Sequence, residues 1–361
     1  MRCSRRAITQ GLTQHDDSDL EPRANTPRVA RPHSSTRALY LARPRTRDAR
    51  PTRESPRLDG AVSSDPRGEG AEAGQRAAAR AVRAGLDGNV EYPEGATYSG
   101  YKGQNGRWTD LSLAAIAQRK KELQNPIAVI ASIDRASLAP NDQLNYDLFR
   151  RGAQDALAGT RFPQEALAID ARSGPQLLPQ ILELNPNATV KDYEDIVARI
   201  DGLGVAVDQT IALMQKGLAH KVTAPRITLR DVPDQVKGLL TDDPMKSPVL
   251  VMFTRFPSSI SEAEQKRLTA AAVKAYTDKV KPAYERLYSY LTKSYIPGAR
   301  ETVGMSALPD GAAWYAYNVR IQTTTDRTPE QIHETGLAEV KRIRGQMDSV
   351  MKSIGYKGTF A

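Results

Sequence analysis

Residues 189–214 read TVKDYEDIVARIDGLGVAVDQTIALM and have the pattern of one long amphipathic helix. Thr189 is placed to cap this helix, and acidic residues follow in its first turn, where the helix dipole favours them. Apolar residues then recur three and four positions apart, so that they share one face. Gly202 and Gly204 interrupt the pattern, and we expect them to allow close packing of a neighbouring helix. The stretch therefore predicts a helical fold.

A second long helical pattern covers residues 262–295. Ser261 and Glu264 form a capping box at its start, and Pro282 is expected to kink it. Its tyrosines are expected to pack in the core or between helices: Tyr276, Tyr284, Tyr288, Tyr290 and Tyr295. A last helix is predicted from Pro329 to about Ile354, with Thr328 as its cap and proline in its first turn.

One segment differs from these helices. Residues Ala313–Gln322 (AWYAYNVRIQ) are rich in aromatic and β-branched residues and predict a short strand. Two interpretations of its side chains stay open. Trp314, Tyr315 and Tyr317 with Arg320 form a candidate substrate groove, because an exposed strand edge can take an extended peptide. Alternatively, the aromatic rings fill a core beneath the helices.

The chain of 361 residues divides into two parts by composition. Residues 1–88 carry 17 Arg, no Lys and 11 acidic residues, which is +6 of the total net charge of +9. With few apolar residues to bury, this part is predicted to be a disordered, Arg-rich tail. It is interpreted as a solvated tail or mis-started sequence, with an RNA-binding arm as the alternative. Residues 89–361 are predicted to form an all-α fold of mainly long amphipathic helices with one short β element.

Several classes of protein are disfavoured by composition. The single Cys3 excludes an intramolecular disulfide framework and a Cys-rich zinc site. Because the excess positive charge lies in the tail without interleaved aromatic residues, no nucleic-acid partner is expected. The sequence has no run of 18 apolar residues, so no transmembrane segment is expected, and no secretory signal is recognisable at the start. The chain as written is expected in the cytoplasm.

Catalytic motifs are incomplete. His333-Glu334 begins a His-Glu-x-x-His zinc motif, but Leu337 stands where the second histidine is needed. We interpret His333 and Glu334 as surface or capping residues of a helix. No nucleophile elbow, phosphate loop or dinucleotide fingerprint occurs. The prediction for catalytic and metal-binding residues in this chain is therefore none.

Seven pieces of sequence, in this order and spacing, carry a family resemblance: EYPEGATYSGY, NDQLNYDLFRR, ARSGPQLLPQIL, TVKDYEDIVARI, KSPVLVMFTRFP, SYIPGARETVGMSALPDGAAWYAY and TTTDRTPEQIHETGLAEVKRI. Over residues 91–361 the chain resembles the bacterial family known as domain of unknown function 885. The resemblance implies a fold similar to the long-helix metallopeptidases, a zinc ion and a peptide-like substrate in full-length members. Those members are often exported.

The resemblance also implies a metal-binding helix of the form His-Glu-x-x-x-x-His and a later Glu-Gly-Trp segment, neither of which occurs in these 361 residues. The chain is therefore interpreted as the N-terminal portion of a zinc-dependent peptidase or hydrolase, truncated and inactive alone, with no cofactor of its own. The alternative is a helical binding or scaffold protein without catalysis. Truncation predicts exposed apolar surface on the last helix, at Val340, Ile343, Met347, Val350 and Ile354.

Overall fold

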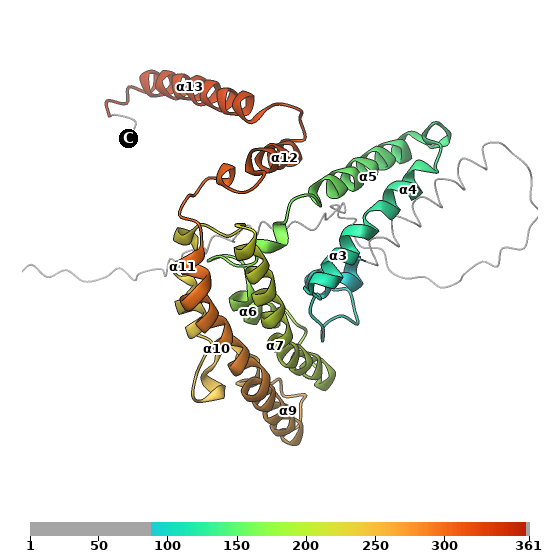
Figure 1. The fold of residues 1–361 in the computed structure, drawn as a ribbon, viewed down its shortest axis with the longest axis vertical. Helices are drawn as coiled ribbons and strands as arrows, with labels where there is room; N and C mark the ends of the chain where they lie inside the picture. Colours follow the sequence, from blue (N-terminus) through green and yellow to red (C-terminus); the bar gives the residue numbers. More distant parts are fainter. Residues whose placement is uncertain (1–87, 359–361) are drawn as a thin grey trace, which may run out of the picture. The chain divides into compact units, whose positions relative to one another are not determined.

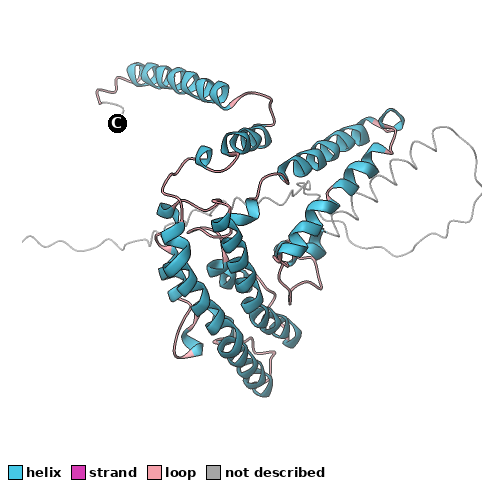
Figure 2. Cartoon of the chain, viewed as in Figure 1, coloured by secondary structure: helices cyan, strands magenta, loops and turns pink. Residues whose placement is uncertain are grey.

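The computed structural model describes residues 88–358, in which every regular element is helical (Figures 1 and 2). The longer helices are α3 (Leu113–Glu122), α4 (Gln124–Ala131), α5 (Pro140–Gly159), α7 (Val190–Ala219), α9 (Glu262–Ala275), α10 (Lys281–Tyr290), α12 (Gly311–Thr323) and α13 (Pro329–Ser353). Shorter α-helices are α2 (Pro93–Tyr98), α6 (Leu178–Leu182), α8 (Val232–Lys237) and α11 (Ile296–Gly298). The all-α prediction is confirmed. The predicted tail lies outside the described residues, except Gly88.

Single turns of other helix types connect these elements. The 3₁₀ turns are η1 (Arg135–Ser137), η2 (Gln164–Ala166), η3 (Pro175–Leu177), η4 (Arg226–Leu229), η5 (Pro244–Lys246), η6 (Pro248–Phe253) and η9 (Met305–Ala307). The π-helical turns are η7 (Tyr276–Val280) and η8 (Leu291–Tyr295). Between residues 88 and 358, the β contacts amount to one isolated bridge, from Asp170 to Ser173.

The predicted strand over Ala313–Gln322 is wrong, because this segment forms helix α12. Alanines between the aromatic residues favour a helix, and the helix turns Trp314 and Tyr317, three residues apart, toward one neighbouring aromatic residue, Phe162. The β propensity of aromatic residues reflects how they pack rather than a backbone preference. Here the packing partners favour the helix.

Helix α7 begins as its sequence predicts. The Thr189 hydroxyl accepts a hydrogen bond from the backbone N–H of Asp192, and the Asp192 carboxylate accepts one from the backbone N–H of Thr189. This reciprocal capping box satisfies two donors that the first turn leaves without helical partners. At the other end, Lys221 adopts a left-handed conformation with φ of 57°, and the Val222 N–H returns to the Gly217 carbonyl at 2.8 Å. The helix thus ends in a Schellman turn.

A continuous helical run from α9 to α11 packs against α7. The Ser261 hydroxyl caps it by accepting from the Glu264 backbone N–H, which is one half of the predicted capping box; the Glu264 carboxylate accepts from Arg267 instead of completing it. The disturbance expected at Pro282 takes the form of the π-helical turn η7, which ends two residues earlier, and η8 stands in the same relation to Pro297. Proline has no N–H and its ring crowds the carbonyl four residues before it. A wider turn at that point keeps the run helical through both prolines.

The main core lies between α7 and this helical run, with α6, α8 and η6 contributing side chains. Ile196, Ile200 and Leu203 of α7 are fully buried there. Tyr276, Tyr284 and Tyr295 are fully buried as well, and Tyr288 and Tyr290 pack against the core while partly exposed. The prediction that these tyrosines belong to the packing is confirmed.

Gly204 of α7 permits close approach of the neighbouring helical run, as predicted, whereas Gly202 faces the side chain of Trp108 rather than a helix. A Cβ atom at Gly204 would lie 3.0 Å from the carbonyl oxygen of Lys279, and one at Gly202 would lie 3.0 Å from the Trp108 ring. The closest approach on this helix is at Gly217, where a Cβ would lie 2.5 Å from the Val222 carbonyl oxygen and 2.8 Å from that of Ala166. Backbone atoms on both sides leave no room for a side chain.

Gly217→Ala is therefore expected to lower the free energy of unfolding by about 1–3 kcal/mol, although alanine favours a helix by about 1 kcal/mol over glycine. The matched control is Gly345→Ala in α13, where nothing lies within 4 Å of the added methyl group. That variant should leave stability unchanged or raise it. Urea denaturation of both variants measures the difference, and equal stability would show that the α7 backbone moves aside freely.

Two fully buried tyrosines differ in their hydrogen bonds. The Tyr284 hydroxyl donates to the Pro175 carbonyl at 2.6 Å. The Tyr295 hydroxyl lies beside the backbone of Ala224, but within the described part of the chain it finds no partner of hydrogen-bonding geometry. Burial raises the pKa of both phenols, that of Tyr295 to about 12. Both side chains therefore resist ionisation while the chain is folded.

Because an unfolded tyrosine ionises at a pKa of about 10, the folded state holds these two protons more tightly. The stability that these two raised pKa values contribute is fully present below about pH 10. It is lost as the pH rises from there toward the pKa values of the folded state. The double variant Tyr284→Phe, Tyr295→Phe should show a shallower loss of stability between about pH 10 and 12. Denaturant unfolding at a series of pH values measures the slope. Parallel slopes in both proteins would contradict the effect of burial.

Candidate functional site

The segment before α12 is a tight turn that fixes where the helix starts. The N–H of Leu308 bonds the Met305 carbonyl, and the N–H of Gly311 bonds the Leu308 carbonyl, each at 2.9 Å. Asp310 is left-handed with φ of 56°. A Cβ atom at Gly311 would lie 2.1 Å from the Met305 carbonyl oxygen, so glycine is required there. The turn sets the direction in which α12 leaves.

The buried face of α12 carries an aromatic cluster. Trp314 is 1% exposed and stacks on Phe162, with ring centroids 5.5 Å apart and planes 9° apart. The Tyr317 ring lies 5.3 Å from the same phenylalanine. Ala166, Val222 and Leu308 complete this separate small core. Trp314 therefore packs as core, whereas Tyr315, on another face of the helix, is half exposed.

Polar contacts join α12 to α5 through Asp155. The Tyr317 hydroxyl donates to the Asp155 backbone carbonyl at 2.8 Å, and Arg320 Nη1 donates to its carboxylate oxygen Oδ1 at 2.7 Å. Burial raises the pKa of Tyr317, and the charge of Asp155 adds to this effect, while Arg320 opposes it. Both polar groups of the candidate groove thus already have partners within the chain.

A second ion pair joins the turn before α12 to the end of α5. Arg161 donates to the Asp310 carboxylate at 2.8 Å, and its guanidinium lies 4.9 Å from the centroid of the Phe162 ring. Because the pair is largely exposed, its contribution is small. Of the four residues predicted to form the groove, Tyr315 is the one with a ring that projects to solvent.

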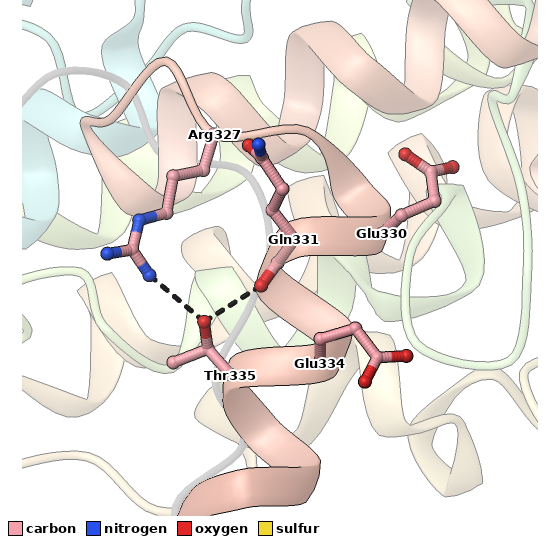
Figure 3. A pocket seen from close by; sticks show the side chains of 5 residues that line it. All are labelled: Arg327, Glu330, Gln331, Glu334 and Thr335. Atoms are coloured by element: carbon pink, nitrogen blue, oxygen red, sulfur yellow. Dashed lines mark hydrogen bonds between the residues drawn. The ribbon is translucent and has the colours of Figure 1, made fainter.

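The start of α13 holds the incomplete zinc motif. Thr328 caps the helix together with Gln331, as predicted. An open depression of about 510 Å³ lies beside it, lined by Arg327, Glu330, Gln331, Glu334 and Thr335 (Figure 3). Arg327 Nη1 donates to the Thr335 hydroxyl at 2.9 Å, and Thr335 donates to the Gln331 carbonyl at 2.8 Å. His333 is exposed, as expected for a surface residue.

The residues of this region do not fit a zinc ion. In the described part of the chain, no three His, Cys, Asp or Glu side chains come together in a way that could hold a metal. Leu337, at the place of the second histidine, is exposed. His220, at the end of α7, has its Nδ1 2.8 Å from the Lys216 carbonyl.

The structure also assembles residues that the sequence did not indicate. Asp155 and Phe162 hold α12 in place, although neither belongs to a recognisable motif. Arg199 of α7 is completely buried. Its position offered a signal, because it lies three residues after Ile196 and four before Leu203, on the apolar face of the helix.

Residues 93–361 match the sequence pattern of a bacterial family described as protein of unknown function (DUF885). The chain belongs to this family. No curated protein matches it significantly. Among solved structures it is similar to the crystal structure of a candidate lipoprotein from Colwellia psychrerythraea, with a TM-score of 0.68 and 19% sequence identity. The match covers 80% of this chain and 52% of the other, so the chain spans about half the length of that structure.

At 19% identity, the likeness to that structure concerns the fold alone. This likeness supports the helical fold described above for the DUF885 chain. In residues 88–358, no helix has both the length and the apolar character needed to cross a bilayer.

Proposed function

We propose that this DUF885 chain forms the helical, non-catalytic half of a zinc-dependent peptidase or related hydrolase and is inactive alone. The observation that carries the proposal is the match of residues 93–361 to the family, by a chain that spans about half the length of the similar solved structure. The family resemblance of the sequence motifs supports the hydrolase class. Metal ligands and general base would then come from residues outside those described.

The test compares the purified chain with a completed protein, in which the C-terminal half of a longer family member is fused to it or co-expressed with it. Zinc content by mass spectrometry and cleavage of a peptide library are measured for both. The chain alone should bind no stoichiometric zinc and cleave no peptide, and the completed protein should do both. Stoichiometric zinc with cleavage by the chain alone would overturn the proposal, as would a folded, completed protein that does neither.

Within this proposal, α12 contributes the substrate side of the cleft. Tyr315 would contact a peptide-like substrate, while Trp314, Tyr317 and Arg320 hold the helix that presents it. The half-exposed ring of Tyr315 supports this division, because tyrosine offers apolar surface together with a polar hydroxyl.

Tyr315→Ala in the completed protein is expected to raise KM about 3–10-fold and to leave kcat within about twofold, since it removes a contact made equally in ground state and transition state. The control is Tyr98→Ala, which removes a more exposed tyrosine at the end of α2, more than 200 residues earlier in the chain. Steady-state kinetics with one peptide substrate separates the two constants. If KM is unchanged in both variants, Tyr315 does not contact the substrate.

The second candidate function is that of a helical binding or scaffold protein without catalysis. It is favoured by the apolar residues exposed along α13, which form a contiguous surface suited to another helix. A completed protein that stays inactive yet retains a defined partner would support this candidate.

A further inference from the structure

We draw no further inference here: the strongest candidate, the exposed apolar face of helix α13 formed by Val340, Ile343, Met347, Val350 and Ile354, carries none, because nothing in residues 88–358 shows what covers it.

Discussion

Arg199→Met is expected to lower the free energy of unfolding by about 3–5 kcal/mol, more than any exposed substitution in this chain. Arg199 is completely buried, and its guanidinium is the centre of a hydrogen-bond network. Nη1 donates to the Asn185 side chain at 2.6 Å and Nη2 to the Thr97 hydroxyl at 2.7 Å. Further donations go to the backbone carbonyls of Pro93, Gln104 and Arg107. Methionine would leave these acceptors buried without donors.

The network joins the segment before α3 to the long helix α7. The Trp108 ring lies 5.1 Å from the guanidinium carbon of Arg199, and its indole N–H donates to the Arg199 carbonyl at 2.6 Å. Burial lowers the pKa of Arg199 to about 10, against the raising effect of the Glu94 and Asp195 charges. A guanidinium at neutral pH is still charged, so five hydrogen bonds and the facing ring take the place of water.

Urea denaturation of Arg199→Met measures the loss, and hydrogen exchange shows whether α2 is released first. The control is Arg286→Met, which removes an exposed arginine paired with Asp208 and should change stability by at most about 1 kcal/mol. Arg199→Lys should recover little, because an ammonium group cannot reach acceptors arranged around a planar fork. Equal stability of Arg199→Met and Arg286→Met would show that the network contributes no net stability.

Trp314→Ala is expected to destabilise α12 by about 3–5 kcal/mol, the range for removing a large buried aromatic side chain. Its ring fills the small core that α12 shares with Phe162, Val222 and Leu308. This core is separate from the main one around α7. The loss should therefore be local, with α12 and the following α13 released while the main core stays folded.

Hydrogen exchange followed by mass spectrometry distinguishes local from global loss. Peptides from residues 305–323 should exchange faster in Trp314→Ala, while peptides from α7 and α10 should remain protected. Tyr315→Ala, at the half-exposed neighbouring position, should leave protection of α12 within about 1 kcal/mol of the original. Uniform loss of protection along the chain would mean that the two cores unfold as one.

The sequence predicted the helices whose signals are local. Three helices begin at the caps that the sequence predicted, which are Thr189, Ser261 and Thr328. These caps are local signals, because each one bonds a backbone group only two or three residues away. Close packing of a neighbouring helix was predicted at Gly202 and Gly204, and it is found at Gly204, where the backbone of Lys279 approaches. The exposed apolar side chains of the last helix, from Val340 to Ile354, were predicted from the interpretation of the chain as truncated.

Prediction failed where distant residues decide the outcome. The aromatic segment around Trp314 was expected to be a strand, since its composition resembles one. Its packing partner is Phe162, about 150 residues earlier in the chain, and the helix is the conformation that brings Trp314 and Tyr317 to that ring. The candidate groove stays a prediction: the structure places Tyr315 at the surface and gives the other three residues partners within the chain.

By itself, the sequence determined the all-α class, the helix starts, the family and the apolar repeat of α13, because each depends on the order of neighbouring residues. The tertiary structure alone decided that α12 is a helix and that a charged Arg199 is buried. The reason is physical: the bond from Arg199 to Pro93 joins residues 106 positions apart. Whether a polar group is satisfied away from water depends on which distant segment arrives beside it.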